Sequence, residues 1–328
     1  MTGLQLPTTV PGARILGIGS FQPERVVTNQ DLEKIVETDD AWIRSRVGIA
    51  ERRVAGPDES LPWMAVTAGR AAITDAGVDP SDLDAVVVAN CTMPNPIPNA
   101  AAQVATGVGA NGIAAFDLNA ACAGFSYGLA VASDMVRAGT ARTVLVVGAE
   151  KLSDWIDWQD RSTCIIFADA AGAAVVGVAD DASVGIGPVS WGSAGDVAST
   201  IRILGETTNK LHQEGQAVFR WATSQIAPVA LDAIARAGLE PSDIDVLIPH
   251  QANLRIVEAI AKKLRAKGAR EDMVVADDIV TSGNTSSASI PMALDHMRAA
   301  GRVRSGDTLL LVGFGAGLSY AGQVVVCP

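Results

Sequence analysis

Short runs of consecutive apolar residues alternate along the chain with longer stretches in which alanine and other apolar residues recur at helical spacing. The short runs are typical of strands covered on both faces, and the longer stretches are typical of helices. We predict strands near residues 12–19, 84–90, 114–119, 143–149, 164–178, 184–192, 244–249, 308–313 and 318–326. We predict helices near residues 60–76, 99–107, 122–138, 214–237, 253–267 and 287–300. This alternation predicts a layered α/β protein.

One segment of the chain recurs in its second half. AGVDPSDLDAVVV begins at Ala76, and the similar AGLEPSDIDVLIP begins at Ala237. A second pair of helix–strand units, with helices ending at Gly139 and Gly301, repeats at nearly the same offset. Both pairs could be ordinary units of a βα protein, but the shared Pro-Ser-Asp turn favours duplication. We therefore predict two similar α/β halves.

The predicted halves are residues 1–179 and 180–328.

Net charge and cysteine usage narrow the class of protein further. A formal net charge of −11 makes general nucleic-acid binding a poor prospect, because phosphate groups need cations. The four cysteines lie far apart without a Cys-x-x-Cys pair, so we expect neither a disulfide framework nor a metal site. No signal peptide or membrane-spanning apolar stretch is recognisable, so we expect a cytoplasmic protein without membrane insertion.

Two predicted helix starts carry candidate chemistry. The offset that relates Gly139 to Gly301 also pairs Cys122 with Asn284, and we expect both to follow a strand and to begin a helix. The positive end of a helix dipole stabilises a thiolate, so this placement predicts a lowered pKa for Cys122. His250 directly follows the predicted strand at 244–249, and strand ends are where layered α/β proteins usually bind ligands.

Each of these residues also has a structural interpretation. A cysteine among small residues is more often part of the core, and a single histidine is more often structural. An asparagine before Thr-Ser-Ser is more often a helix N-cap. Of the three histidines, His212 lies in a polar segment and His296 within a predicted helix, so only His250 follows a strand. The joint placement of Cys122, His250 and Asn284 leaves a Cys–His–Asn site and the structural interpretation evenly balanced.

Four segments resemble the signature regions of β-ketoacyl-acyl-carrier-protein synthase III, the initiating condensing enzyme of type II fatty-acid synthesis in the thiolase superfamily. They are DLNAACAGF, IPHQANLRI, GNTSSASIP and GFGAGLSYAG. The resemblance covers nearly the whole chain, and HQAN together with GNTS is characteristic of this family. It implies the duplicated αβαβα fold of the thiolases, in agreement with the internal repeat. It also implies a homodimer without a tightly bound cofactor.

The resemblance implies a role for each candidate catalytic residue. Cys122 attacks the thioester of an acyl-CoA and becomes acylated, and malonyl-acyl-carrier protein then binds and loses CO₂. His250 and Asn284 stabilise the resulting enolate, whose carbon attacks the acyl group to give a β-ketoacyl-acyl-carrier protein. The backbone N–H groups of Cys122 and Ala316 form the oxyanion hole. Many relatives have glycine at position 316, so the alanine indicates a backbone that does not need a positive φ.

Substrate-binding residues are also implied by the resemblance. Trp42 and Arg161 sandwich the adenine of CoA, and Asn253 contacts its pantetheine arm. Ile97 stands where some acetyl-preferring relatives have a phenylalanine that reaches into the pocket of the other subunit. The smaller side chain predicts room for branched or longer starter groups.

One basic run stands out in this acidic chain. KKLRAKGAR occupies residues 262–270, and Arg255 precedes it on the same predicted helix. Such a run is ordinarily a solvated helix face. The resemblance implies instead that Arg255, Lys262 and Lys263 dock the acidic carrier protein.

Other functions use similar residues. A polyketide starter-unit ketosynthase, or a simple acyltransferase of the same superfamily, would carry the same Cys–His–Asn set. A Cys–His–Asn hydrolase would need its histidine to deprotonate the thiol, and the duplication and the basic run argue against it. A non-catalytic binding protein of the same fold would have no need of Cys122, His250 and Asn284. We therefore expect a condensing acyltransferase.

Overall fold

Two five-stranded mixed sheets form the frame of the molecule, in a computed structural model that describes residues 12–179, 185–203 and 209–328. The first sheet has the order β1-β7-β6-β4-β5, and the second has the order β12-β11-β13-β14-β8. The first sheet consists of β1 (Gly12–Phe21), β4 (Ala85–Ala89), β5 (Ala114–Leu118), β6 (Thr143–Lys151) and β7 (Asp169–Ala179). The second consists of β8 (Ser190–Ser193), β11 (Val246–Pro249), β12 (Val274–Val275), β13 (Thr308–Gly315) and β14 (Ser319–Val326).

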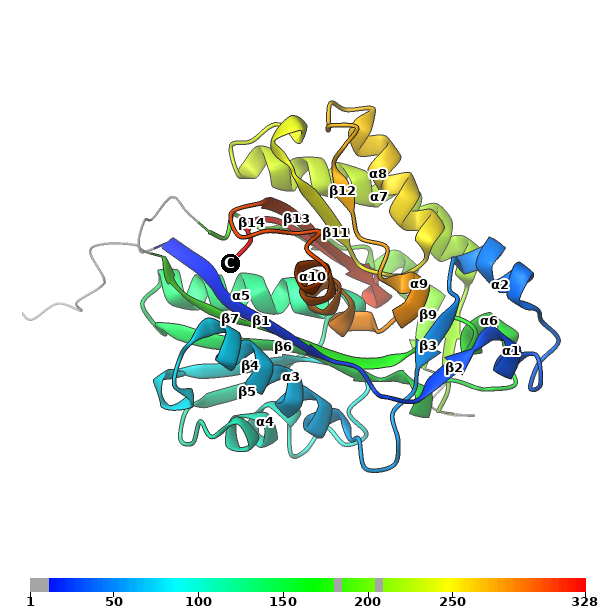
Figure 1. Ribbon diagram of the computed structural model, residues 1–328, viewed down its shortest axis with the longest axis horizontal. Coiled ribbons are helices and arrows are strands. Elements are labelled where there is room, and N and C mark those ends of the chain that lie inside the picture. The colour runs from blue at the N-terminus through cyan, green and yellow to red at the C-terminus, as the bar shows by residue number, and fades with distance from the viewer. Residues whose placement is uncertain (1–11, 180–184, 204–208) are drawn as a thin grey trace, which may run out of the picture.

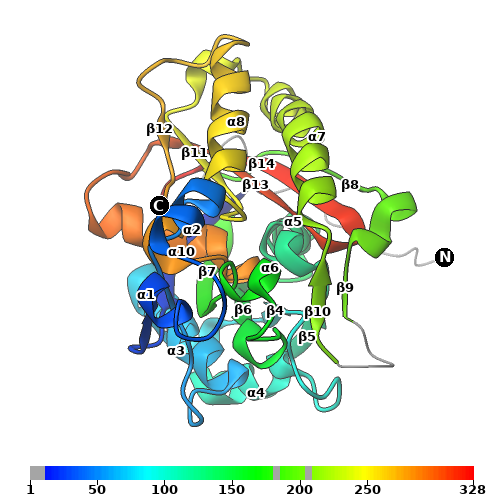
Figure 2. The same ribbon diagram turned by 90° about the vertical axis from the view of Figure 1, so that its right-hand side faces the viewer.

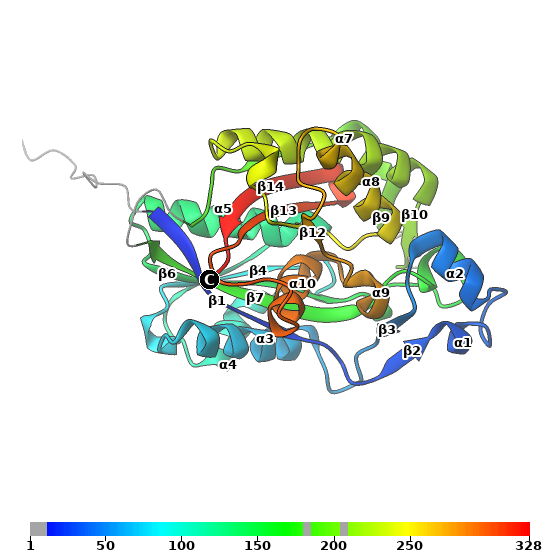
Figure 3. The same cartoon turned by 45° about the horizontal axis from the view of Figure 1, so that its top comes forward.

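Helices cover both outer faces of the sheets and fill the space between them. The longer helices are α3 (Leu61–Ala76), α4 (Ala100–Val108), α5 (Gly124–Arg137), α7 (Gly215–Arg236), α8 (Leu254–Arg265) and α10 (Ser289–Ala299). α5 and α10 lie between the two sheets (Figure 1). α3 and α4 cover the first sheet from outside, and α7 and α8 cover the second on the opposite side of the molecule (Figure 3). This arrangement confirms the predicted layered α/β fold.

Small residues let the central helix α5 pack between two sheets. Nine of its 14 residues are buried, and glycine, alanine and serine make up most of them. On the facing strand β6, a Cβ atom at Gly148 would lie 2.3 Å from the carbonyl oxygen of Ser287. Glycine is therefore required where the strand meets the segment before α10. Deep burial of the helices on both sides explains their richness in small residues.

Short elements extend from this frame toward one end of the molecule. They are α1 (Asn29–Leu32), α2 (Asp40–Val47), α6 (Arg161–Cys164), α9 (Ile279–Ser282), β2 (Val26–Thr28), β3 (Glu51–Arg53), β9 (Ile201–Ile203) and β10 (Leu211–Gln213). β9 and β10 pair as a two-stranded ribbon, and β10 contacts α6 (Figure 2). Among the described residues, no helix is long and apolar enough to cross a membrane.

Two predicted strands differ from the observed ones. The strand predicted at 164–178 begins only at Asp169, because the residues before it form α6 and a turn. Residues 164–168 are all buried, and so is β7 apart from the half-buried Val178, so apolar periodicity could not separate the two segments. The strand predicted at 184–192 begins at Ser190, and Ile186 forms only an isolated bridge with Val325. Its predicted first residue lies outside the described residues.

Candidate active site

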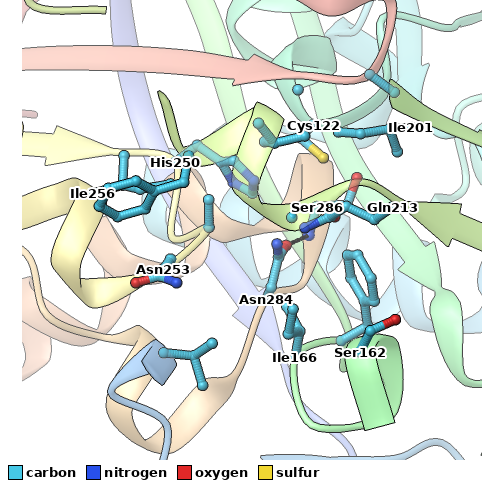
Figure 4. Close-up of a pocket in the computed structure, with 18 of the residues that line it drawn as sticks. Cys122, Ser162, Ile166, Ile201, Gln213, His250, Asn253, Ile256, Asn284 and Ser286 are labelled. Carbon is cyan, nitrogen blue, oxygen red and sulfur yellow. Dashed lines mark hydrogen bonds between the residues drawn. The ribbon is translucent and has the colours of Figure 1, made fainter. Parts of the chain in front are cut away.

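A cavity of about 720 Å³ opens between α2, α6, α8 and the β9–β10 ribbon. Cys122, His250 and Asn284 all line it, although they come from three distant segments of the sequence (Figure 4). Gly315 and Ala316, which end β13 and follow it, line the same cavity. The structure therefore brings together the predicted nucleophile, the two predicted donors and the predicted oxyanion-hole residue.

The backbone around Cys122 adopts a tight turn before α5. Cys122 lies in a short 3₁₀ turn, Ala121–Ala123, which leads directly into the helix. Ala121 has a φ of 45°, in the left-handed region that non-glycine residues seldom adopt. On the facing strand, a Cβ atom at Gly315 would lie 2.5 Å from Cβ and 2.8 Å from Sγ of Cys122. Glycine at 315 therefore allows β13 to approach the thiol.

The predicted low pKa of Cys122 is wrong. Burial raises the pKa of this thiol to about 11. The nearby Ser286 hydroxyl lowers the pKa of Cys122, the buried charge of Glu150 raises it, and the backbone N–H groups of Ala316 and Cys122 lower it. Desolvation outweighs the favourable hydrogen bonds, and at neutral pH the thiol carries its proton. The sulfur must therefore lose a proton when it acts as a nucleophile.

Two backbone N–H groups lie close enough to the sulfur of Cys122 to lower the pKa of the thiol. They belong to Cys122 itself and to Ala316. Donors that converge beside a nucleophile are placed to stabilise the oxyanion that forms when it attacks a carbonyl. Ala316 is not among the described non-glycine residues with a positive φ, which confirms the expectation drawn from its side chain.

His250 is held by a hydroxyl group on α10. The imidazole is 1% exposed, and its Nδ1 atom lies 2.7 Å from the Ser289 hydroxyl oxygen. The ring also packs edge-on against Phe314, with 5.3 Å between ring centroids. Burial lowers the pKa of His250 to about 3, so the ring is neutral and carries one N–H. When the Ser289 hydroxyl donates to Nδ1, that N–H is on Nε2 and is free to act in the cavity.

Asn284 presents its amide nitrogen to the same cavity. The residue is 4% exposed and follows α9 through Gly283, whose φ is 69°. Its side-chain Oδ1 accepts a hydrogen bond from the backbone N–H of Ser286 at 2.9 Å, as the dashed line in Figure 4 shows. Because the oxygen is occupied, the Nδ2 group remains to donate to a ligand.

The expected equivalence of Cys122 and Asn284 is not found. The turn Ala121–Ala123 before α5 corresponds to the turn Ser286–Ala288 before α10, and each begins at a residue with positive φ. The counterpart of Cys122, the middle residue of its turn, is therefore Ser287. The offset between the two turns is larger than the offset between the far ends of the two helices, because α10 has 11 residues where α5 has 14. Asn284 follows a helix and a glycine, and it precedes the turn.

A buried carboxyl group behind the thiol escaped the sequence analysis. Glu150 lies near the end of β6 and is fully buried. Its two oxygens accept hydrogen bonds from the Cys91 backbone, from the Cys91 thiol, and from the hydroxyls of Thr92, Ser286 and Ser287. Burial raises the pKa of Glu150. The signal in the sequence was an acidic residue directly after the apolar run TVLVVGA.

The residues predicted to bind CoA lie at the mouth of the cavity. The Arg161 guanidinium carbon is 4.7 Å from the ring centroid of Trp42, and the Arg46 guanidinium carbon is 5.6 Å from it. A flat ring inserted between Trp42 and Arg161 would need about 7 Å, twice a van der Waals contact distance. Arg161 must therefore move to admit one. Asn253 caps α8 and donates from Nδ2 to the carbonyl oxygen of Arg46 at 3.1 Å.

The residues predicted to dock a carrier protein all lie on α8, which starts at the cavity mouth. Arg255 lines the cavity and stacks over Phe219, with its guanidinium carbon 5.1 Å from the ring centroid. Lys262 and Lys263 are exposed in the last turn, and Lys263 donates from Nζ to the carbonyl oxygen of Thr223. The three cations therefore form one face that extends outward from the mouth.

Ile97 is not part of this cavity. Its side chain is 85% exposed, in the loop between β4 and α4.

Among the described residues, no group of histidine, cysteine and acidic side chains could hold a metal ion, and all four cysteines are free.

The sequence was compared with families and individual proteins of known function, and both comparisons point to one family. Residues 116–195 match the family described as 3-oxoacyl-[acyl-carrier-protein (ACP)] synthase III, and residues 234–327 match its C-terminal part. A beta-ketoacyl-[acyl-carrier-protein] synthase III of Streptomyces coelicolor is 52% identical over 97% of this chain and 99% of the relative.

Solved structures give the same result. The priming beta-ketosynthase from the R1128 polyketide biosynthetic pathway superposes with a TM-score of 0.95 at 41% identity, over 100% of this chain and 99% of that one. The 3-oxoacyl-[acyl-carrier-protein] synthase III from Aquifex aeolicus superposes with a TM-score of 0.90 at 38% identity, over 96% of this chain and 100% of that one.

Proposed function

Because the chain belongs to the β-ketoacyl-acyl-carrier-protein synthase III family, whose members are condensing acyltransferases with the thiolase fold, we propose that Cys122, His250 and Asn284 form its active site. The family assigns the overall reaction, which initiates type II fatty-acid synthesis by decarboxylative condensation of an acyl starter with a malonyl thioester. The observation that carries the residue assignment is the convergence of one thiol and two neutral donors in a single cavity.

Acylation of Cys122 is the first half of the proposed reaction. The sulfur attacks the thioester carbonyl of an acyl-CoA, the carbonyl oxygen becomes negatively charged, and CoA leaves as the acyl-cysteine forms. The N–H groups of Cys122 and Ala316 lie beside the sulfur, where they lower the pKa of the thiol, so they are within reach of an oxyanion formed on a carbon bound to it. Removal of one such donor typically costs about 100-fold in rate.

Decarboxylation and condensation form the second half. The thioester oxygen of malonyl-acyl-carrier protein accepts hydrogen bonds from Nε2 of His250 and Nδ2 of Asn284. Loss of CO₂ then leaves an enolate whose charge these donors stabilise, and the enolate carbon attacks the acyl carbonyl on Cys122. Burial keeps His250 neutral, so its ring N–H acts as a hydrogen-bond donor to the enolate oxygen, where negative charge develops.

Substrate binding follows from the placement of the remaining residues. Arg161 moves to admit the adenine of CoA, which then lies between Trp42 and Arg161. Asn253 contacts the pantetheine arm inside the mouth. The exposed cations of α8 dock the acidic carrier protein. Because Arg255 both lines the cavity and begins this basic face, a carrier protein bound there would direct its pantetheine arm inward.

A homodimer is the proposed assembly. β5 is the outermost strand of the first sheet, and its Phe116 and Leu118 are only half-buried in the single chain. An open sheet edge with apolar side chains favours pairing with a second copy. Ile97 is strongly exposed in the loop that precedes α4, from which it would reach the pocket of the other copy and limit the starter group.

The proposed halves are residues 1–179, which carry Cys122, and 180–328, which carry His250 and Asn284. Each five-stranded sheet falls within one of these ranges. The proposal includes no tightly bound cofactor, because thioesters already provide an activated carbonyl and an acidic malonyl group. It also includes a cytoplasmic location, which four unpaired cysteines fit.

Intact-protein mass spectrometry tests the proposed nucleophile and starter together. The protein is incubated separately with acetyl-CoA and isobutyryl-CoA, and digestion is expected to place the acyl group on Cys122. C122S should show no adduct, and C91S, which removes the other thiol of the cavity, should still be acylated. Absence of an adduct with every acyl-CoA tried, or an adduct on Cys91, would contradict the proposal.

A second candidate function is starter-unit synthesis for a polyketide. The similarity to the priming ketosynthase of the R1128 pathway favours it, since that structure covers the whole chain. Both functions use the same three residues. Product analysis with the carrier proteins of the two pathways separates them, because each function predicts turnover with its own carrier protein.

A further inference from the structure

Glu150 is a buried acid that the proposed reaction leaves without a task. Its described hydrogen-bond partners are the thiol and backbone of Cys91 and the hydroxyls of Thr92, Ser286 and Ser287, all of which are uncharged groups. A carboxyl group in the interior is costly to ionise without a cation beside it. Burial accordingly raises the pKa of Glu150, which makes its carboxylate a better proton acceptor than an exposed one.

Ser286 connects this carboxyl group to the nucleophile. Its hydroxyl oxygen is 3.1 Å from Oε1 of Glu150 and 4.0 Å from Sγ of Cys91, and the same hydroxyl lies close enough to the thiol of Cys122 to lower its pKa. Figure 4 shows Ser286 and Cys122 facing the same cavity. A hydroxyl group has one proton and two lone pairs, so it can donate to the carboxylate while it accepts from the thiol. The hydroxyl of Ser286, which lines the same cavity as Cys122, is therefore placed to pass a proton from the thiol to Glu150.

The acylation step needs such a path. The thiol of Cys122 is protonated at neutral pH, since burial raises its pKa to about 11. The nearest imidazole is a poor acceptor, because burial lowers the pKa of His250 to about 3 and a proton there would create an isolated cation. Of the ionisable groups around the sulfur, Glu150 is the one whose surroundings favour taking a proton.

We propose that Glu150, acting through the hydroxyl of Ser286, receives the thiol proton of Cys122 during acylation. The thiol proton passes to Ser286 Oγ while the hydroxyl proton of Ser286 passes to Oε1 of Glu150. The sulfur lone pair forms the bond to the thioester carbonyl carbon. The bond from that carbon to the CoA sulfur then breaks, and its electrons leave with the CoA thiolate. Glu150 returns the proton through Ser286 to the CoA sulfur, so that acyl-Cys122 and CoA thiol are the only products.

A matched pair of serine variants tests the path. Ser286 and Ser287 both reach Oε1 of Glu150, at 3.1 and 2.9 Å. The second contact of Ser287 is the Ala89 carbonyl, whereas Ser286 lies 4.0 Å from Sγ of Cys91 and also acts on the pKa of the Cys122 thiol. S286A is expected to slow acylation of Cys122 by about 100-fold, the usual size of a proton-transfer contribution. S287A should change that rate by less than about threefold. Ala121 already holds an alanine at a φ of 45°, so the backbone of S286A has a precedent in this fold.

The pH dependence separates proton transfer from a purely structural role. Around the path, the titratable groups of the described residues are Cys91, Cys122, Glu150 and His250. In the wild type, the acylation rate should level off once Glu150 is ionised. In E150Q it should keep rising about tenfold per unit between about pH 7 and 9, because hydroxide then replaces the internal acceptor. E150Q preserves the side-chain volume, and S286A tests the same path if E150Q does not fold.

Rapid-quench mass spectrometry with acetyl-CoA measures these rates, and thermal unfolding reports on folding. Equal loss of rate in S286A and S287A would overturn the proposal, as would parallel pH profiles for E150Q and the wild type. The inference rests on the proposed function, but different experimental results would refute each of them. A wild-type protein that is never acylated refutes the proposed function. A wild-type protein that is acylated no faster than S286A refutes only the proton path.

Discussion

The Nδ1 atom of His250 lies 2.7 Å from the hydroxyl oxygen of Ser289, the first residue of α10. The direction of this hydrogen bond fixes which ring nitrogen carries the single proton of a neutral imidazole. When Ser289 donates to Nδ1, the remaining proton must be on Nε2, where the proposed enolate donor is needed. The first turn of a central helix therefore sets the chemistry of a residue on a separate strand end.

Removing this hydroxyl should impair the second half-reaction more than the first. In S289A, we expect decarboxylation of malonyl-acyl-carrier protein to slow about fivefold to tenfold, as for loss of one hydrogen bond of about 1 kcal/mol. Acylation of Cys122 should change much less. Release of CO₂ and the yield of acyl-cysteine report the two steps. Equal loss in both would show that Ser289 acts on the whole site and not on the imidazole.

Gly315 should tolerate no side chain. In G315A, the added Cβ would lie 2.5 Å from Cβ of Cys122 and would displace the thiol or the strand end. We expect acylation to fall by at least about 100-fold, because a small misplacement of reacting groups is enough for such a loss. G195A is a suitable control, since a Cβ there meets nothing within 4 Å. Near-normal acylation of G315A would contradict this account of the turn.

Trp42 should matter for CoA and not for the chemistry. W42A is expected to raise KM for acyl-CoA about tenfold, because stacking of a base on an aromatic ring is worth about 1–3 kcal/mol. kcat at saturating acyl-CoA should be little changed. W63A is the matched control, since Trp63 is an exposed tryptophan that packs on Phe21. Steady-state kinetics with both variants would disprove the assignment if KM rose equally in each.

Charge reversal on α8 should act on the carrier protein alone. The double variant K262E/K263E is expected to raise KM for malonyl-acyl-carrier protein about tenfold, because each cation faces an acidic partner. The acylation rate with acyl-CoA should stay the same, and it serves as the internal control. The difference in KM between the variant and the wild type should become smaller at high salt, because salt screens the charges. An unchanged KM for the carrier protein would show that this face is merely solvated.

His296 should give stability a pH dependence. Asp278, 2.7 Å from its Nδ1 atom, raises the pKa of His296, burial lowers it, Asp295 raises it and Arg53 lowers it, with a net rise. The contribution is fully present below the ordinary pKa of 6.5 and is lost as the pH rises through the folded-state pKa. Urea unfolding between about pH 6 and 8 should therefore show a decline that H296N lacks. H212N should keep the decline, and equal slopes in H296N and the wild type would refute the prediction.

The fold was largely predictable because its strands and helices have distinct apolar patterns. The helix predicted at 122–138 is found at Gly124–Arg137, and the strand predicted at 143–149 at Thr143–Lys151. Prediction failed where burial is continuous. Residues 164–168 were predicted as part of a strand because that segment is buried and β7 is almost entirely buried, and only the backbone hydrogen bonding separates them.

The site was predictable at its chemically distinctive residues and not at its supporting ones. Cys122 and His250 were identified from their places beside predicted elements. The pairing of Cys122 with Asn284 was wrong, because α10 is shorter than α5 and the offset between the two halves changes along it. Glu150 and Ser286 carry no local signal that connects them. Only the fold brings β6 against the turn before α10.

One cavity holds the thiol and both donors, and α2, α6 and α8 surround its mouth. In the proposed reaction, the two thioester substrates reach the thiol through this mouth in succession. CoA has to leave before the pantetheine arm of the carrier protein can enter. Between these two events, the acyl group on the cysteine is accessible to other thiols and to water. An entrance shared by both substrates thus fixes the order in which they bind, and it makes the stability of the acyl-cysteine toward other thiols and water a determinant of product yield.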